Sequence, residues 1–358
     1  FRLKDDKGDV GSSARDFILC FSARRNFNTI MEKTTSGHPG LETIHMIRFF
    51  AMTLAIIGHR TVQYWNRLSM QLFAGPHIVN AFFGIGGLLV KICNCEYIFY
   101  TFFYYNFLHR LTPAYMMVVF FCALILPHMG SGPLWEWKVG MERDYCANNW
   151  WTNLLFVNNF VNLEQICLFQ SWYVSVDYQL FALALIVTYL FWRMPRKYGY
   201  TFLGAIIVGG CIAPFVDTYF YGAPAEDVRD VPYYLEHYCK IQQRISSYFV
   251  GVLVGAVLYD HLRNPWKLGK VRITTFTFQY NFLTPRLCQP LARLTYGAYL
   301  VHGVIQLYDV GVTRVPRSFA VHNMVQHGTR IFCSTSRIEL DARSEYSRYM
   351  YIHRYVFF

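Results

Sequence analysis

The residues best able to do chemistry are an arginine and a histidine set eleven positions apart in one apolar stretch. Arg48 and His59 lie in the segment ETIHMIRFFAMTLAIIGHR, in which nearly every residue between Ile44 and Ile57 is apolar. In a helix this spacing gives three turns plus roughly 20°, so both side chains lie on one face, about 16 Å apart along the axis. A guanidinium can donate to a carbonyl or phosphate oxygen, and a neutral imidazole can take a proton from a hydroxyl.

Composition indicates that this face belongs to a membrane protein. The chain has 358 residues, of which 54% are hydrophobic and only 15% charged, whereas soluble domains have about 25% charged residues. Its net charge of +11 comes mainly from Lys and Arg between apolar runs, which favours a role in topology over nucleic-acid binding. Residues 1–16 are polar and lack the apolar core of a signal peptide. The chain begins with Phe rather than Met, so we expect it to start inside a longer protein.

Apolar runs predict an all-α, polytopic transmembrane helix bundle with about seven spans. They lie at about 43–60, 72–90, 111–129, 172–192, 201–216, 245–259 and 291–308. Residues 1–41 are interpreted as a cytosolic lead-in, residues 42–310 as an incomplete transmembrane domain, and residues 311–358 as a polar, basic tail. The run Gly84-Ile85-Gly86-Gly87 is interpreted as helix packing rather than chemistry.

Between the third and fourth spans we predict a long loop, 130–168. Its section WWTNLLFVNNF is amphipathic and too short to cross a bilayer, so we expect it either to lie at the membrane interface or to re-enter the membrane. Basic residues gather in one set of connections and acidic residues in the other, which places this loop on the non-cytosolic side. Cys146 and Cys167 then share an oxidising compartment, where a disulfide between them can persist.

Taken together, the motifs resemble the membrane-bound acyltransferase-3 family, in its animal branch named nose resistant to fluoxetine. Arg48 and His59 match that family's Arg-x10-His signature, and the similarity runs from about Phe21 to His302. The other matching segments are FSARRNFN, AFFGIGGLLV, HRLTPAY, Cys146 through WWTNLLFVNNF to Cys167 and SWYVSVDYQLF, RISSYFVGVLVGAVL, and LARLTYGAYLVH.

The resemblance implies an integral membrane enzyme that moves an acyl group, usually from acyl-coenzyme A, onto a hydroxyl of a lipid, sugar or other acceptor. The histidine matching His59 is the family's proposed general base, and the arginine matching Arg48 is required. Acyl-CoA is then a co-substrate, and no bound cofactor is expected. Two positions depart from the family pattern: Phe107 stands where one of a pair of arginines is expected, and Gly86 stands where a serine is expected.

Three further groups of residues are candidates for the site. Asp177 is the sole acid within a predicted span; it either pairs with Arg48, Arg110 or Arg293, or orients His59 or the acceptor. His109 and Arg110 could bind coenzyme A phosphates, although the positive-inside rule alone also explains them.

The acceptor pocket is the third group. Trp151 and Trp172 are candidates for its lining or else interface anchors. His302 has either a pocket role or an interhelical hydrogen bond. No metal site is expected, because Cys93-x-Cys95 offers too few ligands.

Two other classes of membrane protein are alternatives to the acyltransferase hypothesis. A seven-span receptor would place its N-terminus outside, opposite to the charge pattern. A transporter of lipids or xenobiotics is the stronger alternative, because intramembrane Arg, His and Asp also suit translocation. In either case the expected partners are the bilayer and small molecules rather than nucleic acid, and the expected location is a plasma membrane or endomembrane.

Overall fold

The computed structural model describes residues 42–64, 75–92, 111–221, 238–263 and 294–314, and these ranges contain helices and turns without a strand. The prediction of an all-α chain is therefore confirmed. The lead-in, the part of the tail from 315 to 358 and the residues His109, Arg110 and Arg293 lie outside the described ranges. The predictions that concern them stay predictions.

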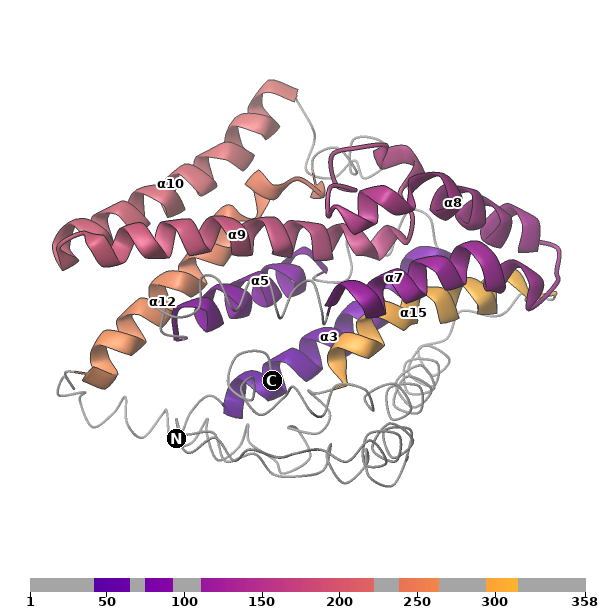
Figure 1. Cartoon of the computed structure of the whole chain (residues 1–358), viewed down its shortest axis with the longest axis horizontal. Coiled ribbons are helices and arrows are strands. Elements are labelled where there is room, and N and C mark those ends of the chain that lie inside the picture. The colour runs from indigo at the N-terminus through magenta and orange to yellow at the C-terminus, as the bar shows by residue number, and fades with distance from the viewer. Residues whose placement is uncertain (1–41, 65–74, 93–110, 222–237, 264–293, 315–358) are drawn as a thin grey trace, which may run out of the picture.

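Each of the seven apolar runs coincides with a helix (Figure 1). The helices with their bounds are α3 (Glu42–Tyr64), α5 (Gly75–Ile92), α7 (Thr112–Phe120), α8 (Met141–Leu154), α9 (Trp172–Arg193), α10 (Arg196–Tyr221), α12 (Ile245–Arg263) and α15 (Thr295–Gly311). The helical path of α7 continues through a π-helical turn, Phe121–Ile125, and a 3-10 turn, Leu126–His128. It therefore fills the predicted third span.

The predicted count of seven membrane spans is not confirmed. Among the described residues, only Phe169–Arg193 and Arg196–Asp217 are both long and apolar enough to cross a membrane. The described apolar portions of α3, α5, α7 and α12 are shorter: Met46–His59, Val79–Leu88, Thr112–His128 and Ile245–His261.

The prediction of a loop over 130–168 is wrong for Glu136–Leu154, which is helical. A π-helical turn, Glu136–Gly140, leads directly into α8, which carries no apolar stripe from which a helix could be predicted. Tertiary contacts hold α8 in place: Asn149 Nδ2 donates to the carbonyl of Gln165, and Asn153 Nδ2 donates to the carbonyl of Cys167. These bonds attach α8 to the irregular segment that follows it. The part of WWTNLLFVNNF after α8 forms turns, in which Phe156 has a left-handed φ of 56°.

Two groups of helices build the core on either side of α9. The first group packs α5, α10 and α12 against one side of α9, around Val176, Leu180 and Phe249. The second packs α7, α8 and α15 together, around Tyr115, Val139 and Val304. Helix α3 lies beside α5 and α15, and its Met52 and Ile56 form a small cluster with Ala298 of α15 (Figure 1).

Helices α5 and α12 approach each other at backbone distance because glycines face the contact on both. A Cβ atom on Gly87 would lie 2.0 Å from the carbonyl oxygen of Tyr248, and one on Gly251 would lie 1.9 Å from that of Gly84. The expectation that this glycine run serves packing agrees with these distances. Gly86, the residue before Gly87, instead faces the carboxylate of Asp177 and the ring of Tyr248.

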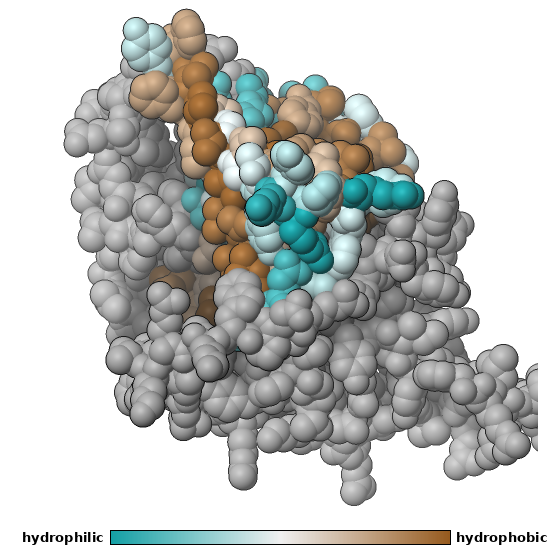
Figure 2. Space-filling model, turned by 90° about the vertical axis from the view of Figure 1, so that its left-hand side faces the viewer, coloured by the Kyte–Doolittle hydropathy of each residue, from teal (hydrophilic) through white to brown (hydrophobic). Residues whose placement is uncertain are grey.

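Helix α10 presents much of its apolar side outward. Val208, Ile212 and Phe215 are each more than half exposed, and the charged end of the helix is tied to α12 by an ion pair of 3.1 Å between Arg196 and Asp260. Figure 2 views the end of the molecule where α9 meets α10 and shows a strip of apolar side chains beside a hydrophilic patch. Such a division suits a helix with one end in water and its side in lipid.

Candidate active site

His59 and His302 form the centre of the candidate site. Nδ1 of His59, near the end of α3, lies 2.8 Å from Nε2 of His302, in the middle of α15, and the two rings are nearly parallel. The side chain of His302 is fully buried, and its Nδ1 lies 2.5 Å from the carbonyl oxygen of Tyr299 and 3.2 Å from that of Ala298. The two residues are 243 positions apart in the chain. We refer to them as the histidine pair.

A second hydrogen bond joins the same two helices one turn further along. Nε2 of Gln306, four residues after His302, donates to the carbonyl of Ile56, three residues before His59, over 3.0 Å. Gln306 is 1% exposed, and its Oε1 has no hydrogen-bond partner among the described residues. The polar side of α15 therefore holds both the imidazole of His59 and the α3 backbone that carries it.

Arg48 lies near Asp177 rather than near His59. The guanidinium on α3 interacts electrostatically with the carboxylate on α9 and with the hydroxyl of Tyr173, one helical turn before Asp177. Of the partners considered for Asp177, the structure thus brings Arg48 to it. The attraction between opposite charges grows where water is partly excluded, which favours keeping these two side chains close.

Three tyrosines surround this charge pair and connect it with the histidine pair. Tyr173, Tyr248 and Tyr299 all lie within electrostatic range of Asp177. The ring of Tyr299 lies 5.7 Å from that of Tyr173 and 5.7 Å from that of His302, measured between centroids. The hydroxyl of Tyr299 donates to the carbonyl of Gln170, which fixes the start of α9 against α15.

The three residues predicted to line an acceptor pocket are not gathered in one place. Trp151 lies on α8 and is 39% exposed, whereas Trp172 is 3% exposed in the core beside α12. His302 contacts His59 instead of a tryptophan.

Near Trp172 the structure contains a buried cation that sequence reasoning missed. The guanidinium of Arg244 lies 4.1 Å from the ring centroid of Tyr238 and 5.7 Å from that of Trp172. Its N–H groups donate to Asn80 Oδ1 and to the carbonyl of Tyr238. Arg244 is therefore held by neutral acceptors and aromatic rings at the start of α12.

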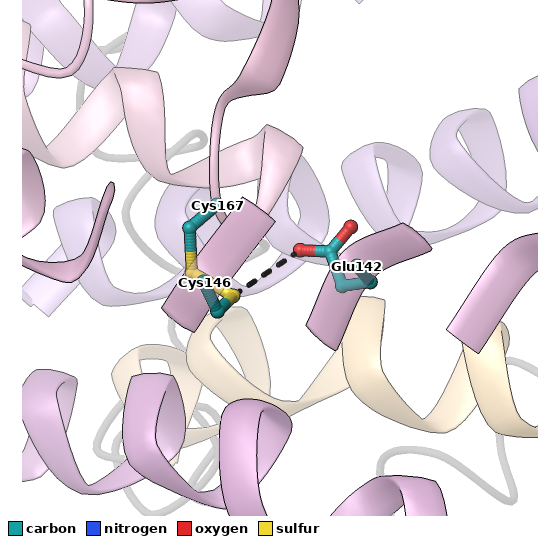
Figure 3. A group of neighbouring side chains, drawn as sticks. All are labelled: Glu142, Cys146 and Cys167. Carbon is teal, nitrogen blue, oxygen red and sulfur yellow. Dashed lines mark hydrogen bonds between the residues drawn. A yellow bond between two sulfur atoms is a disulfide. The ribbon is translucent and has the colours of Figure 1, made fainter. Parts of the chain in front are cut away.

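A disulfide joins α8 to the start of the segment leading into α9. Cys146 and Cys167 are linked, with Cα atoms 4.5 Å apart, and the Glu142 carboxylate lies beside them (Figure 3). Glu142 Oε1 is 3.7 Å from the Cys146 sulfur, which carries no hydrogen in a disulfide, and it accepts a bond of 2.5 Å from the Leu168 N–H. Burial raises the pKa of the Glu142 carboxyl to about 7, against a smaller lowering by that N–H. Because both sulfurs are in the disulfide, the three side chains do not form a metal site.

Comparison with known proteins bears directly on the resemblance. Over 297 residues the chain is 24% identical to nose resistant to fluoxetine protein 6 of Caenorhabditis elegans, a match that covers 70% of the chain. The resemblance to the nose-resistant-to-fluoxetine branch is confirmed. The aligned region covers 35% of the length of that relative. No protein-family model matches the chain, and no solved structure matches it.

Proposed function

We propose that this chain is part of a multi-pass membrane acyltransferase in which His59 is the general base. The acyl donor is an acyl-CoA-type thioester, and the acceptor is a hydroxyl of a lipid, sugar or other small molecule. The observation that carries the proposal is the hydrogen-bonded state of His59. Its Nδ1 is engaged by His302, while the described residues provide no hydrogen bond to its Nε2. An imidazole held through one nitrogen, with the other open, is arranged as in known acyl-transfer catalysts.

The reaction needs one proton acceptor and later one proton donor. The acceptor hydroxyl oxygen attacks the thioester carbonyl carbon while His59 Nε2 takes the hydroxyl proton. The carbon–sulfur bond then breaks, and the departing thiolate takes that proton from His59, which leaves an ester and a free thiol. A general base of this kind contributes about 10²–10⁴-fold to the rate.

Arg48 and Asp177 would hold the donor in this proposal. A guanidinium has five N–H donors, so Arg48 can bind Asp177 and still offer hydrogen bonds to a carbonyl or phosphate oxygen. In this proposal His109 and Arg110 could add contacts to the phosphates of coenzyme A. The similarity to a nose-resistant-to-fluoxetine protein supports the membrane setting.

The test uses membranes that contain the full chain and a series of radiolabelled acyl-CoA donors. We expect label to pass into an extractable acceptor, with His59→Ala lowering turnover by about 10²–10⁴-fold at equal expression. Arg48→Ala should chiefly raise KM for the donor. Arg48→Lys should reverse part of that increase, because lysine restores the positive charge but not the planar guanidinium with its several N–H donors. Turnover that His59→Ala leaves unchanged would remove the catalytic assignment.

A transporter is the second candidate, favoured by the charges of Arg48 and Asp177 inside the helix bundle. Oppositely charged groups inside a helix bundle also suit the movement of ions or protons. Uptake of a labelled lipid by vesicles, lost in Asp177→Asn but retained in His59→Ala, would favour this reading. The same membranes would then show no transfer of the acyl group.

A further inference from the structure

The direction of the hydrogen bonds around His302 follows from its backbone partners. Its Nδ1 lies within hydrogen-bond distance of two carbonyl oxygens, those of Tyr299 and Ala298. A carbonyl oxygen only accepts, so Nδ1 of His302 must carry a hydrogen. These acceptors belong to the preceding turn of the same helix, so α15 itself fixes the position of the hydrogen on the ring.

This assignment decides which nitrogen of His59 carries a proton. A neutral His302 with its hydrogen on Nδ1 has a lone pair on Nε2, which lies 2.8 Å from Nδ1 of His59. Two lone pairs at that distance would repel, so Nδ1 of His59 carries the hydrogen and donates it. The lone pair of a neutral His59 is then on Nε2.

A charged His302 would reverse the direction but is costly. The side chain is 0% exposed, and its hydrogen-bond partners among the described residues are two carbonyls and another imidazole, without a carboxylate. A buried cation without a paired anion is strongly disfavoured. The neutral form is therefore the one that this site holds.

We propose that His302 is a positioning residue that selects the tautomer of His59 and stabilises the imidazolium formed when His59 accepts a proton. This inference rests on the proposed function for its catalytic consequence, but the tautomer itself can be measured without any activity. In a serine-protease triad a carboxylate accepts a hydrogen bond from the histidine and so fixes its tautomer. Here a neutral acceptor, His302 Nε2, takes that role, and the proton of His302 on Nδ1 is held by backbone carbonyls of α15.

Gln306 supplies a matched control because it ties α3 to α15 without contacting the imidazole. His302→Leu and Gln306→Leu each remove one hydrogen bond between the two helices, and each places an apolar side chain in a buried position. A merely structural role of His302 predicts that both changes have the same effect. A positioning role predicts that only His302→Leu alters His59.

The tautomer test is solid-state NMR of the full chain, labelled with ¹³C and ¹⁵N histidine, in lipid bilayers. The His59 signals are assigned by their loss in His59→Asn, and ring-carbon shifts report which nitrogen is protonated. We expect the Nδ1–H tautomer in the wild type, in Gln306→Leu and in His302→Gln, whose amide oxygen can accept the same hydrogen. We expect mixed tautomers in His302→Leu. An Nε2–H tautomer in the wild type would overturn the inference, even if the variants failed to fold.

The activity test separates this inference from the proposed function. A hydrogen bond to a charged group has a larger effect than one to a neutral group, so His302→Leu should lower kcat by about 10- to 100-fold with KM within about threefold. His302→Gln should recover most of that loss, and Gln306→Leu should stay within about threefold of the wild type. Equal losses in both leucine variants would refute positioning. Absence of acyl transfer with the expected tautomer would refute the proposed function and leave the selection of the tautomer standing.

Discussion

Replacing Gly87 by alanine tests how closely α5 and α12 pack. The new Cβ atom would lie 2.0 Å from the carbonyl oxygen of Tyr248 and 3.0 Å from the amide nitrogen of Val252, both of which are backbone atoms. Ordinary contact begins near 3.4 Å, so the helices would have to separate by about 1.4 Å at this point. Overpacking of a close-packed interior costs typically about 1–3 kcal/mol. A clash with two backbone groups belongs at the upper end of that range.

Gly86→Ala is the matched control for this change. A Cβ there lies 3.3 Å from Asp177 Oδ1 and 3.3 Å from a ring carbon of Tyr248, which are side-chain atoms able to shift by a few tenths of an ångström. Both substitutions gain about 1 kcal/mol of helix propensity. We therefore expect Gly86→Ala to be neutral or stabilising, and Gly87→Ala to be less stable than Gly86→Ala by about 2–3 kcal/mol.

Thermal unfolding of the purified chain in detergent, followed by tryptophan fluorescence, measures the difference. Gly251→Ala should behave like Gly87→Ala, because its Cβ would lie 1.9 Å from the carbonyl oxygen of Gly84. A Gly87→Ala protein as stable as Gly86→Ala would show that the two helices do not approach at backbone distance. The reasoning about their packing would then be wrong.

Three further predictions concern the segment around α8. The Glu142 carboxyl has a pKa of about 7 in the folded chain, against an ordinary value of about 4.5, so the folded state keeps its proton to a higher pH and the free energy of unfolding should fall, by at most about 3 kcal/mol, as pH rises from about 4.5 to 7. In Glu142→Gln the melting temperature should not show this decline. The same decline of melting temperature with pH in the wild type and in Glu142→Gln would contradict the prediction. Replacing both Cys146 and Cys167 by alanine should lower stability by about 3 kcal/mol, because the disulfide closes a loop with a sequence separation of 21; unchanged unfolding in the double variant would count against it. A glycosylation acceptor inserted near Ser131 should be modified in microsomes, whereas an unmodified acceptor there and in the 217–244 segment would reverse the assigned orientation.

Sequence patterns predicted the helices other than α8 and the shared face of Arg48 and His59, because both follow from apolar runs and helical periodicity. They could not predict the partner of either residue. His302 lies 243 positions from His59, and its place is set by how α15 packs on α3. Asp177 had three arginines as candidate partners, and only the arrangement of α9 against α3 brings Arg48 to it.

The helix α8 and the buried Arg244 were missed for different reasons. α8 has no apolar stripe and is held by side-chain bonds to later carbonyls, such as that from Asn149, which no local pattern reveals. Arg244 lies at the edge of an apolar run, where an arginine usually marks a water-exposed end. A sequence signal did exist for Gln306, since it lies one turn after His302 and so on the same helix face.

The glycine contact between α5 and α12 also has a mechanical consequence. Two helices packed this closely cannot rotate or slide past each other without a clash between a side chain of one and a backbone carbonyl of the other. They therefore form the stiff part of the bundle. Helix α3 is joined to α15 by side-chain bonds from His302 and Gln306, and such bonds can break and re-form as a helix shifts. Any motion that admits a ligand should therefore occur at α3 and α15. Each such displacement would break and re-form the hydrogen bond between His59 and His302.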